Sequence, residues 1–168
     1  CIRDSYCGGS LSQRTNEGRS RLWCAAGSRF VYENPIPAAT GIIEDEAGRI
    51  LLVERNREPQ AGMWALPGGF VERDESPVEA ATRELLEETG LAVSGPELLD
   101  VIYQESDFYG TSLLIIGYRF AAWRGTPAAG DDAAAVRFFY PNELPELAFG
   151  SHRDLVDLWL SRQTPGIR

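Results

Sequence analysis

The sequence predicts an α/β fold, in which β-strands alternate with two helices. Aliphatic and β-branched residues dominate the runs 38–43 and 50–55, as in buried strands. Between residues 76 and 90 the chain carries the start signal, the periodic apolar positions and the stop signal of a helix. A second helical pattern begins at Ser151. Strands interspersed with helices in this way are typical of an α/β domain.

The first two strands are predicted to form a hairpin, because the turn-forming segment 45–48 lies between them. A short strand at 63–66 then leads into Pro67, Gly68 and Gly69. Three later strands, separated by turn-rich segments, are expected at 98–104, 112–121 and 136–140. These strands supply the sheet of the predicted domain.

The first helix has well-marked ends. Ser76 is a good N-cap, Pro77 suits the first helical position and Glu79 completes a capping box. Gly90 supplies the stop at the C-terminal end. At 3.6-residue spacing, the stripe expected to face inward consists of Val78, Ala81, Thr82, Leu85 and Thr89.

The second helix is predicted to start at Ser151, with Asp154 as its capping partner. Its apolar face is expected to consist of Leu155, Leu158 and Trp159. His152 follows the predicted cap, which favours a residue of the first helical turn over a catalytic base. The sequence thus places the only histidine of the chain in a structural position.

Composition excludes several classes of enzyme. The chain contains no lysine, so Schiff-base chemistry, a P-loop and a protein kinase site are all excluded. A single histidine forbids a multi-histidine zinc centre. The net charge of -9 disfavours nucleic acid polymers and anionic membranes as partners. No apolar run is long enough for a membrane span, and a cytoplasmic location is expected.

The acidic residues concentrate on the first predicted helix. Glu84, Glu87 and Glu88 span about 100° of its circumference near the C-terminal end, where like charges repel and the helix dipole disfavours anions. One interpretation is a solvated acidic face relieved by Arg83, which would bond Glu79 or Glu87. The other is a cluster of hard oxygen ligands for a divalent cation such as Mg²⁺.

The spacing favours the second interpretation. Gly69, Glu75 and the run 83–91 (Arg-Glu-Leu-Leu-Glu-Glu-Thr-Gly-Leu) reproduce the Nudix box in register. Chance agreement is on the order of 10⁻⁸ per starting position. The chain therefore resembles the Nudix hydrolase superfamily, whose members hydrolyse a nucleoside diphosphate linked to another moiety. This resemblance implies an α/β/α sandwich with a mixed, partly antiparallel sheet and a catalytic box that forms a loop–helix–loop.

The resemblance also assigns roles to residues. Three glutamates are expected to hold Mg²⁺ or Mn²⁺ and to act in catalysis: Glu84, Glu87 and Glu88. Arg83 would position these carboxylates, paired with Glu75 or Glu87. Gly68 and Gly69 would let the backbone approach the metal and the phosphates closely.

One residue departs from the pattern of related enzymes, which often carry a further Glu just before the last core strand. Ala135 stands at that position in this chain. Asp131 or Asp132 could substitute for it, and so could Glu105 or Asp107 from another loop. Each of these four acids could equally be a solvated loop residue.

The first 31 residues are predicted to be a degenerate zinc-ribbon-like segment, and residues 32–168 the Nudix domain. One interpretation is a structural Zn²⁺ held by Cys1, Cys7, Cys24 and Asp4. The other, which we favour, is a decayed ribbon with free thiols, because a fourth nitrogen or sulfur ligand is missing. The cysteines and the Tyr-Glu-Asn-Pro run at 32–35 resemble the zinc-ribbon-bearing branch that includes NADH pyrophosphatases.

The sequence leaves the substrate open. An ADP-ribose-like or dinucleotide substrate is expected, with a nucleoside triphosphate diphosphatase and a non-catalytic nucleotide sensor as alternatives. Phe108 and Tyr109 could stack on a base, although core positions are more usual for aromatics. Arg55 and Arg57 could reach a phosphate, although solvated surface positions are more usual. Many members of the superfamily dimerise, so a homodimer is one expected state.

Overall fold

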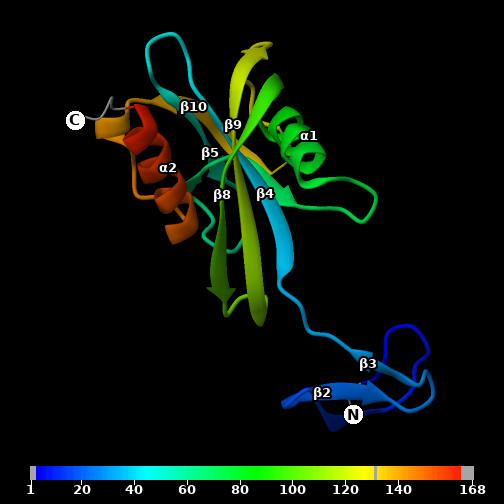
Figure 1. Cartoon of the computed structure of the whole chain (residues 1–168). Helices are drawn as coiled ribbons and strands as arrows, with labels where there is room; N and C mark the ends of the chain where they lie inside the picture. Colours follow the sequence, from blue (N-terminus) through cyan, green and yellow to red (C-terminus); the bar gives the residue numbers. More distant parts are fainter. Residues whose placement is uncertain (1–2, 131, 164–168) are drawn as a thin grey trace. The chain divides into compact units, whose positions relative to one another are not determined.

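The computed structural model of the chain describes residues 3–130 and 132–163. The chain divides into two units, Cys1–Asn34 and Pro35–Arg168. Figure 1 shows the elements of each unit, coloured along the sequence. Within the described residues, no helix combines the length and the apolar character that crossing a membrane requires.

The smaller unit is a three-stranded antiparallel sheet. Its strands are β1 (Leu11–Asn16), β2 (Arg19–Cys24) and β3 (Arg29–Val31), in the order β1-β2-β3. Trp23 and Phe30 pack edge to face across β2 and β3, with their ring centroids 4.9 Å apart.

The described residues of the larger unit form two sheets and two α-helices. The first sheet consists, in order, of β7 (Gly68–Phe70), β4 (Ile36–Ile43), β9 (Thr111–Arg124) and β8 (Ala92–Ser106). The second consists of β10 (Ala133–Phe139), β5 (Ile50–Arg55) and β6 (Trp64–Ala65). The two α-helices are α1 (Pro77–Thr89) and α2 (Gly150–Gln163), and a short 3-10 turn, η1 (Pro141–Glu143), precedes α2. Strands β4 and β9 run parallel and the other paired strands run antiparallel, so the predicted mixed α/β fold is confirmed.

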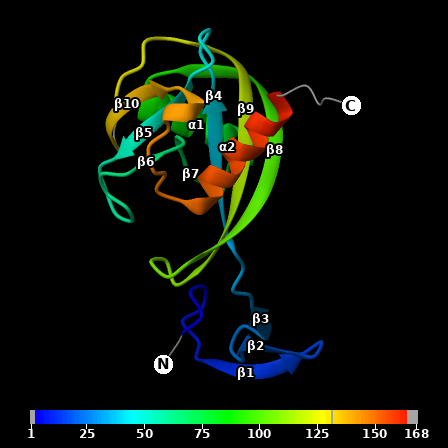
Figure 2. The same cartoon turned by 90° about the vertical axis from the view of Figure 1, so that its left-hand side faces the viewer.

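Helices α1 and α2 cover opposite faces of this arrangement, as Figures 1 and 2 show. Because side chains alternate along a strand, β4 contributes to a core on each face. Ala38 and Ile42 belong to the cluster beneath α2, whereas Ala39 and Ile43 belong to the cluster beneath α1. The candidate site lies beside β4, where the end of β5, the loop after it and β7 line a cleft.

Helix α1 has the predicted ends. Ser76 accepts from the backbone N–H of Glu79 while the Glu79 carboxylate accepts from the backbone N–H of Ser76, and Gly90 caps the C-terminus in the left-handed conformation. The predicted inward stripe is only partly correct. Ala80 and Glu88 are buried with Ala81, Leu85 and Thr89, whereas Val78 and Thr82 are half-buried.

Two local predictions were wrong or incomplete. The turn at 45–48 forms and Glu44 pairs antiparallel with Ile50, but the hairpin stops at this single bridge because β4 and β5 belong to different sheets. Ser151 lies inside α2 and does not cap it, because its hydroxyl donates to Gln104 Oε1 at 2.5 Å. In both cases, partners distant in the sequence outweigh the local signal.

Candidate active site

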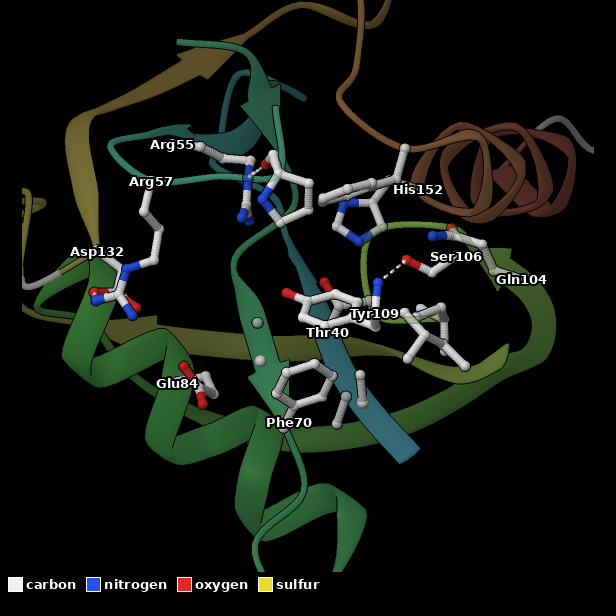
Figure 3. Close-up of a pocket in the computed structure, with 18 of the residues that line it drawn as sticks. Thr40, Arg55, Arg57, Phe70, Glu84, Gln104, Ser106, Tyr109, Asp132 and His152 are labelled. Carbon is white, nitrogen blue, oxygen red and sulfur yellow. Dashed lines mark hydrogen bonds and ion pairs between the residues drawn. The ribbon is translucent and has the colours of Figure 1, made fainter. Parts of the chain in front are cut away.

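A cleft of about 300 Å³ opens beside the N-terminal half of β4. Its walls come from β4, β5, β7, α1, the end of β8 and the start of α2, so residues distant in the sequence meet there. Figure 3 shows the side chains that line it. A second hollow adjoins the cleft and is lined by Arg57, Glu84, Glu87, Glu88 and Asp132.

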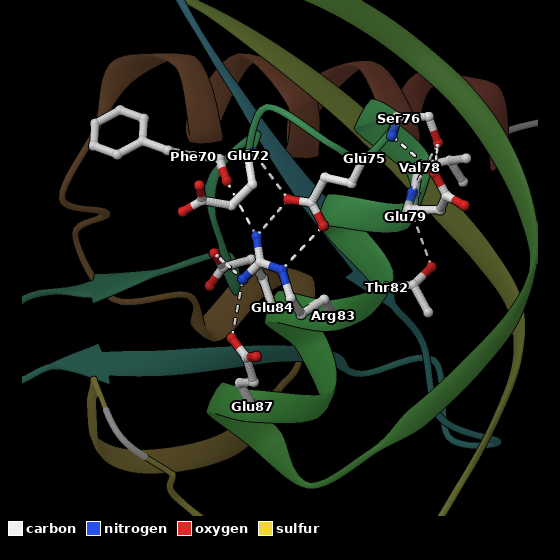
Figure 4. Close-up of polar contacts among 10 residues, drawn as sticks. All are labelled: Phe70, Glu72, Glu75, Ser76, Val78, Glu79, Thr82, Arg83, Glu84 and Glu87. Atoms are coloured by element: carbon white, nitrogen blue, oxygen red, sulfur yellow. Dashed lines mark hydrogen bonds and ion pairs between the residues drawn. The ribbon is translucent and has the colours of Figure 1, made fainter.

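Arg83 ties the acidic side chains of the box together (Figure 4). Its guanidinium donates to both oxygens of Glu75, at 2.6 and 3.0 Å, and to the carbonyl of Phe70 at 3.2 Å. The same group donates to Glu84 Oε1 at 2.8 Å and to Glu87 Oε2 at 3.0 Å. Three partners were considered for Arg83. The structure shows Glu75 and Glu87, whereas the carboxylate of Glu79 accepts from Ser76 instead. This hydrogen bonding lowers the pKa of Glu75, which stays ionised.

The three glutamates of the box differ in their surroundings. Glu87 is exposed, whereas only 7% of Glu88 is accessible. Burial raises the pKa of Glu88 to about 7, although its Oε2 accepts from the N–H of Gly68 at 2.9 Å. Burial also raises the pKa of Glu84. The interpretation of a solvated acidic face therefore fails for Glu88, whose carboxylate is buried against β7.

The two glycines before the helix allow this close approach. A Cβ at Gly69 would overlap the carboxylate of Glu84, and a Cβ at Gly68 would overlap the backbone of Ala39 and Thr40. Gly68 has a φ of +155°, which disfavours other residues. Side chains at either position would push β7 away from α1 or from β4.

Asp132 is the acid that joins the glutamates. It lines both the cleft and the hollow, and its carboxylate forms an ion pair with Arg57. Glu105 instead accepts from the hydroxyl of Tyr103, and neither Glu105 nor Asp107 lines the cleft. Asp131 lies outside the described residues.

The loop that leads to Asp132 is bonded to the end of α1. Ala128 donates its N–H to the carbonyl of Thr89 at 2.9 Å, and Gly130 donates to the carbonyl of Glu88 at 3.1 Å. A Cβ at Gly130 would overlap the Glu87 carbonyl, so the loop lies directly against the helix. On the other side, the carbonyl of Asp132 accepts from Asn56, just after β5, at 3.1 Å.

Three cleft residues were treated as structural or surface positions in the sequence. Arg55 is half-buried, donates Nε to the carbonyl of Pro59 at 2.8 Å and lies 5.0 Å above the ring of Phe149. Tyr109 lines the cleft with its ring 5.2 Å from that of Phe70, so the expectation of a core position is wrong. His152 is a first-turn residue as predicted, but it also lines the cleft.

The protonation of His152 follows from its position. Its Nδ1 accepts from the backbone N–H of Leu66 at 3.1 Å. Burial lowers the pKa of His152 to about 3, so the imidazole is neutral at physiological pH. No sequence signal marks this role, because Leu66 and His152 are 86 residues apart.

A second set of candidate ligands lies in the smaller unit. One ligand atom each from Asp4, Cys7 and Cys24 lies within 4.8 Å of the others, and the two sulfur atoms are 3.3 Å apart. Both oxygens of Asp4 accept from Arg29, which holds the pKa of that carboxyl well below its usual range. Cys1, the remaining predicted ligand, lies outside the described residues.

Comparison with known proteins agrees with this geometry. The family model of the NUDIX domain matches residues 34–159. The chain belongs to the Nudix family.

Relatives of this Nudix chain include named enzymes. An ADP-ribose pyrophosphatase of Methanocaldococcus jannaschii is 39% identical over 127 residues, which are 76% of this chain and 75% of that protein. A putative 8-oxo-dGTP diphosphatase of Bacillus subtilis is 36% identical over 104 residues, 62% of this chain and 66% of that protein. The crystal structure of a NUDIX hydrolase from Nitrosomonas europaea superposes with a TM-score of 0.75 at 26% identity, covering 97% of this chain and 92% of that one. The predicted family and its enzyme class, a Nudix pyrophosphohydrolase, are confirmed, whereas the zinc-ribbon branch stays a prediction.

Proposed function

We propose that this chain hydrolyses a pyrophosphate bond in a nucleoside diphosphate linked to another moiety, with a divalent metal ion as cofactor. The observation that carries the proposal is the hollow in which Glu84, Glu87, Glu88 and Asp132 meet, beside a cleft with two arginines. The relative named an ADP-ribose pyrophosphatase supports an ADP-ribose-like substrate, and a dinucleotide is the other substrate that we propose.

The donor set of the hollow fits Mg²⁺ or Mn²⁺. Carboxylate oxygens are the ligands that these hard cations prefer, and a glutamate cluster without a cation would repel a pyrophosphate. Glu88 is buried close to Glu84, which raises the free energy of its ionised form, and a cation would lower it. We assign Glu84, Glu87 and Glu88 as the ligands. A bound cation supplies charge neutralisation at the phosphates and an acidified water.

Side chains around the hollow hold this arrangement. Arg83 orients Glu84 and Glu87, and Glu75 anchors the guanidinium of Arg83 through two hydrogen bonds. The N–H of Gly68 fixes Glu88. Arg83 is therefore assigned as a positioning residue, which acts through the carboxylates.

Arg55 is suited to bind a substrate phosphate. Its guanidinium is half-buried in the cleft, and no carboxylate of the described residues forms an ion pair with it. A cation that has lost part of its hydration without gaining an anionic partner gains most from an anionic ligand. In a chain without lysine, Arg55 and Arg57 are the basic residues that line the cleft.

The alternative is a nucleoside triphosphate diphosphatase, which the relative named a putative 8-oxo-dGTP diphosphatase favours. Both activities use the same box, so only turnover separates them. A panel with ADP-ribose, dinucleoside polyphosphates and nucleoside triphosphates is assayed with Mg²⁺, with Mn²⁺ and with EDTA. Release of phosphate or nucleotide that EDTA abolishes supports the enzyme, and no release from any substrate would overturn it. In that outcome, binding without turnover would indicate a nucleotide sensor.

For the smaller unit we propose a decayed zinc ribbon. Arg29 already satisfies both oxygens of Asp4, so a metal ion would compete with this ion pair for the carboxylate. Zinc analysis of the purified chain tests the proposal. We expect less than one equivalent, and one equivalent of zinc per chain would overturn it.

The cellular location, the partners and the oligomeric state of the enzyme are also proposals. We expect a cytoplasmic enzyme. Its net charge of -9 favours a nucleotide-containing small molecule over a nucleic acid polymer as its partner. A homodimer is the assembly expected from the resemblance to the family. Sedimentation at micromolar concentration measures it, and a single species of 18.5 kDa would exclude a stable dimer.

A further inference from the structure

The cleft has two sides of different chemistry, as Figure 3 shows. Glu84, Asp132 and Arg57 lie on one side. Gln104, Ser106 and His152 lie on the other, and we call these three residues the donor wall. The rings of Phe70 and Tyr109 lie between the two sides. A ligand that spans the cleft therefore meets the two acids and Arg57 at one end and the uncharged donor wall, with the cation of Arg55 near His152, at the other.

His152 presents a proton donor to the cleft. Because its Nδ1 accepts from the N–H of Leu66, that nitrogen carries no proton. The ring is neutral, so the proton is on Nε2. Among residues 3–130 and 132–163, no hydrogen bond from this Nε2 to another residue is found. A donor on a side chain that is only 8% exposed gains free energy from a ligand acceptor.

The other two members of the donor wall have the same polarity. Gln104 uses its Oε1 to accept from Ser151 at 2.5 Å, which leaves the amide NH₂ available. Ser106 uses its Oγ to accept from the N–H of Tyr109 at 3.4 Å, which leaves its O–H to donate. All three side chains thus offer donors, and their acceptor atoms are already engaged.

We propose that the donor wall binds the part of the substrate beyond the pyrophosphate, and that His152 determines its specificity through a hydrogen bond from Nε2. The matching ligand is an uncharged ring with acceptor atoms at its edge, packed against Tyr109 and Phe70. Carbonyl oxygens of an oxo-base and hydroxyl oxygens of a ribose both have this chemistry. An exocyclic amino group would face a donor with a donor. The link to a substrate rests on the proposed function, but the binding site itself does not.

Binding of three probes without a cleavable pyrophosphate tests the proposal. Inosine monophosphate and adenosine monophosphate differ at the 6-position, where one has a carbonyl and the other an amino group. Ribose 5-phosphate carries the sugar without a base. Each is titrated calorimetrically into the wild type, His152→Asn and His152→Gln, with Glu46→Gln as a control in an exposed turn.

The two substitutions separate the two nitrogens of the ring. The Oδ1 of Asn can replace Nδ1 and accept from Leu66, but its amide does not reach the position of Nε2. The amide nitrogen of Gln lies near the position of Nε2 and can donate in its place. We therefore expect His152→Asn to weaken binding about 3- to 10-fold, the effect of one neutral hydrogen bond, and His152→Gln to restore part of it.

The pattern among the probes identifies the ring. A loss for inosine monophosphate alone assigns the donor wall to an oxo-base, and an equal loss for all three probes assigns it to the ribose. No measurable binding to the wild type, or equal affinity for folded His152→Asn and the wild type, would overturn the proposal.

Turnover separates this proposal from the proposed function. The titrations need neither a metal ion nor hydrolysis, so they can succeed where every hydrolysis assay fails. Where turnover is measurable, His152→Asn is expected to raise KM more than it lowers kcat, because the residue contacts the group that does not react. A purely structural role would lower the melting temperature without this split.

Discussion

Replacing His152 by Asn changes how the stability of the folded chain depends on pH. The pKa of His152 lies at about 3 in the folded chain, against 6.5 in the unfolded chain. Between these two values the unfolded state binds a proton that the folded state excludes. Stability therefore falls as the pH falls from about 6.5 towards 3.

The magnitude follows from the shift. Between pH 7 and pH 5, His152 costs about 2 kcal/mol of stability, because each pH unit inside the window is equivalent to about 1.4 kcal/mol. Glu88 has the opposite effect. Its pKa is raised to about 7, so the folded state takes up a proton that the unfolded state, at 4.5, does not, and stability rises on acidification by a similar amount. The wild type is thus expected to change little over this range.

Urea unfolding followed by tryptophan fluorescence at pH 7, 6 and 5, in EDTA, measures the difference. With the histidine removed, only the effect of Glu88 is left in this pair. His152→Asn is therefore expected to gain about 2 kcal/mol relative to the wild type between pH 7 and pH 5. Parallel pH profiles for the two proteins would refute the reasoning, and Glu46→Gln serves as the control that should follow the wild type.

Three further predictions concern the box and its helix. Glu88→Gln should reduce turnover at least ~10²-fold, the scale of losing a critical electrostatic group, whereas the control Glu46→Gln should not reduce it. Unchanged turnover of Glu88→Gln would show that Glu88 is not part of the metal site. Arg83→Lys should lower kcat/KM about 10-fold or more and weaken Mn²⁺ binding, because an ammonium cannot reproduce the planar guanidinium that holds Glu75 in two hydrogen bonds. Wild-type values of both quantities would contradict this role. Ser76→Ala should lower the free energy of unfolding by about 1 kcal/mol without changing kcat, and an unchanged urea midpoint would show that the cap contributes nothing.

Helix α1 was predictable because its signals are local. The cap at Ser76, the stop at Gly90 and the spacing of the box all act within a few residues of one another. The pairing of Arg83 with Glu75 was also within reach of the sequence, because both belong to the motif. The burial of Glu88 was not, since it depends on how β7 packs beside α1.

The rest of the cleft is a product of long-range contacts. Asp132 is brought to the glutamates by a loop whose course cannot be predicted from hydrophobic periodicity. Arg55 resembles the polar end of a strand in the sequence, so its place in the cleft could not be predicted either. In the sequence Ser151 resembles a helix cap, but in the structure its hydroxyl donates to Gln104, 47 residues earlier in the chain. Alternation along β4 and β5 could not show that the two strands enter different sheets, because a sequence turn does not fix the divergence after it.

The hydrogen bonds from Ala128 and Gly130 to the carbonyls of Thr89 and Glu88 have a mechanical consequence. These bonds join the last turn of α1 to the loop after β9. A tilt of the helix would therefore move Asp132 together with the glutamates. An insertion before residue 128 can bulge outward and leave the acidic hollow intact. An insertion after Gly130 would displace Asp132, because Asn56 holds the carbonyl of that residue. Among related proteins, differences in the length of this loop should therefore concentrate before residue 128.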